Sequence, residues 1–599
     1  MFGYVGKILR IDLTDGSMVF EDTPKDIVED FIGGSGLASR ILYDELKEGV
    51  DPLSPGNILI FATGPVTGSK ALFSGRHLVA AKSPLTGIYG QATSGGYFGA
   101  ELKYSGIDAL ILEGKSDHPV YISIKDSDIE IKDAKDLWGL DSVETEEEIL
   151  KESEAKTRVS CIGPAGENLV KFAAIMNDGG AAGRTGMGCV MGSKNLKAIT
   201  VKGTGEVKVA REDELKELVD EIRKQLKRNA LMKDLSEHGT AGGATALNMF
   251  GSLPTKYFKE GSFAGGNKID GHTMTKTILK KRETCYNCPV ACKRVVEITE
   301  GPYSGLVGRG AEYETCAAFG SLCMNDSLEL VSKMNDLCNR LGLDTISTGN
   351  VIAFSMECYE KGITDKEGLG GIELDWGSHD MVKLVEMISK REGFGDILAE
   401  GVRIAAEKIG AKDIALHCKG LEIPMFDPRA LSGMGLIYPT SIRGACHMMG
   451  MSTYSEMNVI SYSSLDVPKR IDPRSTEGKA QLVKTLQDWM TFINSAVLCE
   501  LPLIRINKGP DYTAKIYSLV TGIEMDVEDM VRAGERIYNL QRSFNLREGI
   551  SQRDDVLPKR FTDESHSKGP CKGITADIGP MLSEYYDLRG WKDGIPVER

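Results

Sequence analysis

The spacing of apolar residues changes once along this chain, near residue 208. Before that point apolar and polar residues alternate, as over residues 7–20 and 120–131, and each run surrounds a polar turn; this pattern predicts β-hairpins. After it, apolar residues recur with a helical period, over residues 215–226, 381–388 and 482–493. The sequence therefore predicts an α+β protein in which a β-rich N-terminal domain precedes two mainly helical domains.

The chain is long enough for three such domains. Its 599 residues exceed the length at which single cores usually divide. We place the first boundary at the change of period and the second near Gly420, before Pro424 and the turn at Asp427 and Pro428. The expected domains are residues 1–208, 209–420 and 421–599.

Glycine is the unusual component, with 68 residues that gather in short clusters within apolar sequence. The main clusters lie at residues 33–36, 94–99 and 179–192. Such clusters indicate positive φ angles or close backbone approach. None has the spacing of a dinucleotide fingerprint or a P-loop, so a nucleotide site is not expected.

The charge of the chain and its targeting signals bear on the class of protein to expect. The net charge of −14, with basic residues interspersed, argues against a nucleic-acid partner. We find no signal sequence and no membrane span, and we expect a cytoplasmic protein. The 13 cysteines are an odd number in such a chain, which favours metal or redox use over a disulfide framework.

Three cysteines form a C-x-x-C-x-x-x-C motif at Cys285, Cys288 and Cys292. Thiolates this close can converge on one metal centre, and an iron–sulfur cluster with one distant cysteine is the favoured interpretation. A structural zinc and three buried apolar cysteines are the alternatives. The spacing is the reverse of the radical-SAM motif, and it does not select the fourth ligand.

The order of several motifs resembles the tungsten-containing aldehyde:ferredoxin oxidoreductase family, and the resemblance extends over essentially the whole chain. Besides the cysteine motif, the matching segments are residues 94–103, 163–169, 173–178, 182–184, 191–199, 341–348, 391–401 and 557–561.

This resemblance implies a β-rich base and two helical domains that enclose a bis-pyranopterin cofactor. The cofactor would carry tungsten, or molybdenum, which the sequence does not distinguish, and Mg²⁺ would bridge its phosphates. A 4Fe-4S cluster would lie alongside, and the family pattern places its fourth ligand at Cys499. Exposed backbone N–H groups in the glycine clusters would suit the phosphates.

The resemblance also assigns individual residues. Arg76 would lie between pterin and cluster, Glu314 would act as a general base toward water, and His447 would polarise a carbonyl or carry a proton. The other pterin-contacting positions are Thr93, Gly95, Ala181, Gly183, Arg184, Asn339, Leu343, Asp344, Arg443, Asn494 and Leu498.

Several residues depart from the family pattern. Asn339 and Asn494 stand in place of pterin-binding aspartates, Val497 in place of a glycine, and Phe426 in place of an active-site tyrosine. Thr93, Gly180 and Met449 stand where relatives have Asn, Arg and Lys, so the net charge around the cofactor changes little. Lys333 and Val382 replace a Glu and a His that bridge subunits through a metal in related dimers, so that bridge is not expected and the oligomeric state stays open.

The expected activity is the interconversion of aldehydes and carboxylic acids, with electrons passed to ferredoxin or a similar carrier. One alternative is a member of the same family that acts on a thioester, an aromatic ring or a sulfur compound. A second is a non-catalytic iron–sulfur electron-transfer subunit, although Glu314 and His447 argue against it.

Overall fold

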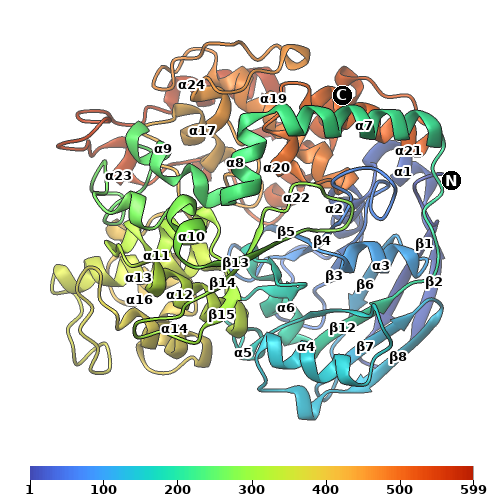
Figure 1. Ribbon diagram of the computed structural model, residues 1–599, viewed down its shortest axis with the longest axis horizontal. Helices are drawn as coiled ribbons and strands as arrows, with labels where there is room; N and C mark the ends of the chain where they lie inside the picture. The colour runs from blue at the N-terminus through green and yellow to red at the C-terminus, as the bar shows by residue number, and fades with distance from the viewer. Residues whose placement is uncertain (598–599) are drawn as a thin grey trace.

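The computed structural model describes residues 1–597, and its N-terminal region holds two six-stranded mixed sheets (Figure 1). The first has the strand order β2-β1-β6-β3-β4-β5 and the second β11-β10-β9-β12-β7-β8. The strands are β1 (Lys7–Asp12), β2 (Met18–Asp22), β3 (Leu59–Ala62), β4 (Arg76–Lys82), β5 (Tyr89–Gly95), β6 (Ala109–Glu113), β7 (Val120–Lys125), β8 (Asp128–Asp133), β9 (Arg158–Cys161), β10 (Ile175–Asn177), β11 (Gly180–Ala182) and β12 (Leu196–Lys202).

Both predicted hairpins are confirmed. Strand β1 pairs antiparallel with β2, and β7 pairs antiparallel with β8. Each sheet also contains one parallel pair, β1 with β6 and β7 with β12, so neither sheet is a simple meander.

Alternating residues of the first sheet face two different layers. Leu9 and Phe61 belong to a core shared with the second sheet, whereas Ile8 and Ile60 face the main core that the helices build. Helices α3 (Phe98–Tyr104) and α6 (Met187–Ser193) contribute to the layer between the sheets. The inner strands of the first sheet are therefore buried on both faces, whereas the edge strand β2 exposes Val19 and Phe20, so only the ends and edges of the sheet can carry polar chemistry.

The rest of the chain is mainly helical, as predicted. The three apolar stripes lie on α7 (Glu212–Arg228), α14 (Met381–Lys390) and α19 (Lys479–Ala496). The remaining α-helices are α1 (Lys25–Phe31), α2 (Gly34–Glu45), α4 (Ser142–Lys151), α5 (Pro164–Glu167), α8 (Ala230–His238), α9 (Ala244–Phe250), α10 (Gly271–Thr277), α11 (Tyr313–Phe319), α12 (Leu328–Leu341), α13 (Thr345–Glu360), α15 (Phe394–Leu398), α16 (Val402–Lys408), α17 (Ser432–Thr440), α18 (Thr453–Glu456), α20 (Glu500–Leu503), α21 (Gly509–Thr521), α22 (Val527–Arg547), α23 (Lys559–Thr562) and α24 (Gly579–Arg589). No helix described between residues 1 and 597 is long and apolar enough to cross a membrane.

Small sheets interrupt the helical region, which the apolar spacing did not predict. The three-stranded sheet consists of β13 (Leu279–Glu283), β14 (Lys293–Glu297) and β15 (Val307–Arg309). The two-stranded sheets are β16 (His417–Cys418) with β17 (Leu421–Glu422), and β18 (Trp591–Lys592) with β19 (Ile595–Pro596). The strands of the larger sheet have mostly charged, half-exposed residues, so they lack a continuous apolar face.

The edge strands of the two large sheets meet. Strand β5 ends the first sheet and β11 ends the second, and a Cβ at Gly180 would lie 3.1 Å from the carbonyl oxygen of Gly95. It would also lie 3.1 Å from Ser94 Oγ. Glycine at position 180 thus permits the close approach, and the sheet edges form one continuous wall.

A second close approach joins the start of α2 to the end of α19. Gly34 has φ +38°, and a Cβ there would overlap Val497 Cγ2 and lie 2.6 Å from the carbonyl oxygen of Asn494. Val497, at the C-terminus of α19, itself has a left-handed φ of 57°. The first glycine cluster therefore lets the start of α2 approach the end of α19, the segment that leads to Cys499.

Gly34→Ala should lower the thermal midpoint of unfolding, because overpacking costs about 1–3 kcal/mol and little space is left for a side chain. Gly49→Ala is the matched control, since Gly49 has φ +74° but no atom within 4 Å of the added Cβ. The control isolates the backbone cost of a positive φ, about 1 kcal/mol. Equal shifts in midpoint for the two variants would contradict the packing argument.

Candidate active site

A cavity of about 800 Å³ lies where the two sheet edges face the helices. Its wall includes every residue predicted for cofactor binding, cluster ligation or catalysis except Leu498. Leu498 is buried beside it, and its backbone N–H donates to Ile493 O at 3.1 Å. Residues far apart in sequence thus converge on one space.

The first sheet contributes Arg76, Thr93 and Gly95. Arg76 begins β4 opposite Gly95 on β5, and its Nη1 donates to Thr93 Oγ1 at 2.8 Å. A Cβ at Gly95 would lie 3.1 Å from Cys285 Sγ, so the glycine lets the cysteine approach the strand. Burial would lower the pKa of Arg76, but the neighbouring Cys499 and Glu500 outweigh it and raise the pKa, so this arginine stays charged.

The second edge contributes Ala181, Gly183 and Arg184. Arg184 follows β11, donates from Nη2 to Glu422 O at 2.6 Å and holds Nε 3.7 Å from Asp344 Oδ2. Asp344 caps α13, since its side chain accepts from the Ile346 and Ser347 N–H groups. The carboxylate therefore serves both the helix end and the buried arginine.

Arg443 reaches the cavity from the loop after α17. Its Nη1 donates to the carbonyl oxygen of Gln91 on β5, and its Nη2 donates to Cys446 Sγ at 2.7 Å. The guanidinium thereby joins the helical region to the first sheet, and its Nε faces the cavity region without a partner.

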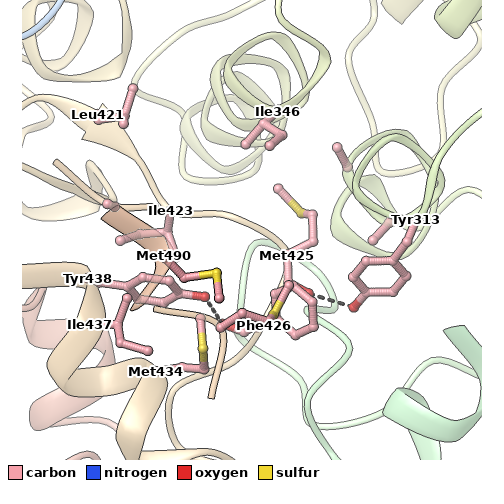
Figure 2. Packing of buried hydrophobic residues seen from close by; sticks show 14 of the residues in the cluster. Tyr313, Ile346, Leu421, Ile423, Met425, Phe426, Met434, Ile437, Tyr438 and Met490 are labelled. Atoms are coloured by element: carbon pink, nitrogen blue, oxygen red, sulfur yellow. Dashed lines mark hydrogen bonds between the residues drawn. The ribbon is translucent and has the colours of Figure 1, made fainter. Parts of the chain in front are cut away.

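Glu314 and His447 lie side by side in this wall. Glu314 Oε1 is 3.5 Å from His447 Nε2, and Glu314 Oε2 accepts from the Met425 N–H at 2.9 Å. Figure 2 shows the neighbouring residues Met425 and Phe426, whose carbonyl oxygens accept hydrogen bonds from Tyr313 Oη and Tyr438 Oη respectively. The ring of Phe426 lies 5.5 Å from that of His447, so an apolar surface flanks the pair.

Burial favours the neutral forms of both groups. It raises the pKa of Glu314 to about 8, with a small further contribution from Asp344, although the Met425 N–H and Arg184 oppose the rise. It lowers the pKa of His447 well below its usual value, and Arg184 and Arg443 add to this effect. Near neutral pH the pair can hold a proton on the carboxyl group and leave the imidazole uncharged.

Buried polar atoms without a protein partner gather around the cavity. They are Arg76 Nε, Arg184 Nε and Nη1, Arg294 Nε, Arg443 Nε, Ser94 Oγ, Thr453 Oγ1, Glu314 Oε1, His447 Nδ1 and Glu500 Oε2. Buried polar groups normally have partners, because an unsatisfied one costs about 1–3 kcal/mol. The concentration of donors in one wall fits a large anionic ligand.

The cysteine motif occupies the connection between β13 and β14. Cys285, Cys288 and Cys292 are partly exposed, as is Cys499, whereas the other nine cysteines are buried. Burial raises the pKa of the three motif thiols, to about 12 for Cys288. A metal would have to displace their protons.

The backbone of Phe73 joins the motif to Cys499. Its carbonyl oxygen accepts from the Cys499 N–H at 3.0 Å, and its N–H donates to Asn287 O at 3.2 Å. No three of the four sulfurs lie within 4.8 Å of one another in the described part of the chain.

Sequence reasoning missed two polar residues of this wall. Glu500, beside Cys499, has a pKa raised to about 7 by burial, although Arg76 and Arg443 lower it. Gln91 orients the Arg443 side chain through its carbonyl oxygen and donates to Met449 Sδ at 3.6 Å. The position of Glu500 next to a predicted ligand was the available signal for it; Gln91, within a buried strand, gave none.

Six of the departures from the family pattern line the cavity, namely Thr93, Gly180, Asn339, Phe426, Met449 and Asn494. Asn494 donates to Met490 O at 2.9 Å within α19, and Asn339 lies near the end of α12. Gly180 stands where relatives have an arginine, but another positive charge lies nearby. A Cβ added at Gly180 would lie 3.4 Å from Lys293 Nζ. A cation therefore remains beside the second sheet edge.

Glu314→Gln should alter how stability depends on pH in the cofactor-free protein. A glutamate in an unfolded chain has a pKa of about 4.3, whereas that of Glu314 is raised to about 8, so the folded chain binds this proton more tightly. Raising the pH through this window therefore destabilises the unaltered protein, while the variant escapes the penalty. We expect the thermal midpoint of the variant, minus that of the unaltered protein, to increase as the pH is raised from 5 to 9. A difference that does not change with pH would refute this assignment.

Comparisons with known proteins agree over the whole chain. Residues 8–203 match the description "Aldehyde ferredoxin oxidoreductase, N-terminal domain", and residues 217–599 match "Aldehyde ferredoxin oxidoreductase, domains 2 & 3". The chain is 42% identical to the tungsten-containing aldehyde ferredoxin oxidoreductase of Pyrococcus furiosus, an alignment that covers 100% of this chain and 98% of the relative. It is 40% identical, with the same coverage, to the protein of that name from Thermococcus kodakarensis.

More distant relatives share the architecture. The chain is 32% identical to the WOR-like subunit of an aliphatic sulfonate oxidoreductase of Pyrococcus furiosus, with 100% of this chain and 96% of the relative covered. The active-site complex BamBC of benzoyl coenzyme A reductase superposes with a TM-score of 0.84 at 26% identity, over 100% of this chain and 96% of that one. The predicted family and the prediction of an oxidoreductase are confirmed. The chain belongs to the aldehyde ferredoxin oxidoreductase family.

Proposed function

We propose that this protein oxidises aldehydes to carboxylic acids at a tungsten bis-pyranopterin cofactor and passes the electrons to ferredoxin or a similar carrier. The observation that carries the proposal is the set of unpartnered buried atoms on Arg76, Arg184 and Arg443 around one large cavity. Relatives at 40–42% identity bear the name of this activity.

The donor chemistry of the wall supports the cofactor. Three guanidinium groups suit the phosphates of two pterins, and Mg²⁺ would bridge those phosphates. The glycines of the sheet edges leave room for a bulky ligand, as at Gly183, where an added Cβ would meet only Asp344. The positions proposed to contact the cofactor are Arg76, Thr93, Gly95, Ala181, Gly183, Arg184, Asn339, Leu343, Asp344, Arg443, Asn494 and Leu498.

Each of the three proposed domains supplies part of the cavity wall. Residues 1–208 provide the sheet edges, 209–420 the cysteine motif with Glu314 and Asp344, and 421–599 provide Arg443, His447 and Cys499. The cavity would then be complete only when all three regions are folded together, and a phosphorylated ligand would hold them against one another.

The four partly exposed cysteines are the proposed ligands of a 4Fe-4S cluster. Arg76 is next to both Cys499 and Cys285, and it also contacts Thr93 on the cofactor side. This placement makes the arginine a polar connection between the two redox centres.

When bound, the cofactor supplies the two-electron acceptor. Glu314 accepts a proton from the attacking water, because it lines the cavity, its Oε1 has no hydrogen-bond partner, and a pKa of about 8 allows it both to take and to release a proton close to neutral pH. His447, held uncharged, donates a hydrogen bond to the carbonyl oxygen of the substrate from the nitrogen that bears its proton. Phe426 gives this pair an apolar neighbour, so the aldehyde's organic substituent has a surface to contact.

The fourth cluster ligand can be tested with Cys499→Ser. The variant should lose the EPR signal of the reduced 4Fe-4S cluster together with about four irons per chain, the content of such a cluster. Cys338→Ser is the control, because Cys338 is a buried cysteine outside the proposed ligand set. An intact cluster in the Cys499 variant would show that another residue is the ligand.

The activity can be tested on protein purified without oxygen, by metal analysis and aldehyde-dependent viologen reduction. We expect tungsten in the protein, reduction with simple aldehydes, and a loss in kcat of about 10²–10⁴-fold in Glu314→Gln with tungsten retained, the range typical of a lost general base. Full metal content without aldehyde oxidation, but with turnover of a sulfonate or a thioester, would overturn the aldehyde assignment and support the alternative substrates. Zinc in place of tungsten would reject the cofactor itself.

A further inference from the structure

A second cluster of metal-ligating side chains lies in the wall of the cavity and shares no residue with the predicted cofactor and cysteine sites. Asp234, His238 and His272 each place one ligand atom within 4.8 Å of the other two. The first two lie on α8 and the third on α10, and Asp234 and His272 line the cavity. Neither the family resemblance nor the catalytic proposal uses these residues.

Two glycines bring the elements that carry them together. Gly271, the first residue of α10, packs directly on the backbone of His238, and a Cβ there would lie 2.6 Å from the Gly242 nitrogen. A Cβ at Gly242 would lie 2.8 Å from Asp234 Oδ2. The rings of His238 and His272 consequently stack with centroids 4.0 Å apart.

Neighbouring side chains orient His238 for metal binding. Its Nδ1 lies 3.0 Å from Thr275 Oγ1, and that hydroxyl group can donate its proton to Gly271 O at 2.7 Å. Thr275 then acts as an acceptor toward Nδ1–H, so the lone pair is on Nε2, which lies 3.9 Å from Glu237 Oε2. Metal-binding histidines usually donate their other ring N–H to such a second group.

His272 is set between two carboxylates. Its Nε2 is 3.5 Å from Asp234 Oδ1, and its Nδ1 is 3.7 Å from Asp270 Oδ2. Asp270 is itself fixed, because it accepts from the Thr273 N–H and from Thr245 Oγ1. One carboxylate is thus available as a ligand and the other as support for the ring.

Asp234 and His272 are about 40% exposed, so small rotations can bring their atoms to the spacing of about 3.3 Å that bonds of about 2.0–2.1 Å to one ion require.

We propose that Asp234, His238 and His272 bind one divalent transition-metal ion such as Zn²⁺ or Fe²⁺ at the wall of the central cavity. Two histidines and one carboxylate are a common ligand set for such ions and leave coordination positions open. Because Asp234 and His272 line the cavity, an open position faces a space from which water or an anionic oxygen ligand can enter. This proposal is independent of the proposed function.

Co²⁺ is a suitable probe, because its visible spectrum distinguishes nitrogen and oxygen ligands from thiolates. The cluster-loaded, full-length protein should bind one Co²⁺ per chain at micromolar concentration, with a spectrum that lacks thiolate charge-transfer bands. His272→Gln and His238→Gln should each weaken binding more than tenfold. Asp270→Asn removes the carboxylate beside His272 Nδ1 but keeps an amide oxygen that can accept from the Thr273 N–H, and it should weaken binding by about tenfold.

His118→Gln is the matched control, since His118 is a partly exposed histidine that contacts the carboxylate of Asp117 without a second histidine beside it. Its affinity for Co²⁺ should be unchanged, and the iron content of every variant should stay constant as a check on folding. Binding of Co²⁺ only at millimolar concentration, a thiolate spectrum, or equal affinity in the unaltered protein and the two histidine variants would each overturn the proposal.

Discussion

Three arginines, Arg76, Arg184 and Arg443, surround one cavity without a full set of protein partners, and the arrangement of the molecule depends on them. Removing a cation from water costs several kcal/mol unless opposite charge or hydrogen bonds compensate. Here carbonyl oxygens of Glu422 and Gln91 and the hydroxyl of Thr93 satisfy part of each guanidinium. An anion that binds the remaining donors would add its binding free energy to the stability of the fold.

Because the cavity lies at the sheet edges, backbone groups of the strands can come close to such a ligand. Edge strands expose N–H and C=O groups, which proteins usually cover or pair. Here β5 and β11 turn their edges toward each other and toward the cavity. Glycine at position 180 removes the side chain that would separate them, and glycine at position 95 leaves room for Cys285. The same positive environment acts on the proton-carrying pair, because Arg184 and Arg443 help to keep His447 uncharged.

The sequence predicted the elements whose signals are local. The hairpin at residues 7–22 and the helix at Met381 carry their period in their own residues. The sheet β13-β14-β15 escaped prediction because it is stabilised by pairing around the cysteine loop and not by an apolar face. The spacing of the cysteines also could not identify the fourth ligand. Cys499 is connected to the motif through the backbone of Phe73, which lies more than 400 residues before Cys499 in the sequence.

Arg294 connects the proposed histidine site to the cysteine motif. Its Nη2 donates to Leu235 O and Ser236 O at the C-terminal end of α8, and its Nη1 donates to Ala291 O, one residue before Cys292. A cation at this end is favourable, because the last carbonyl groups of a helix carry partial negative charge. A metal on Asp234 and His238 would hold the same short helix through two further residues. Since Arg294 is buried and bonded to both segments, α8 cannot shift without disturbing the loop that carries three of the proposed cluster ligands.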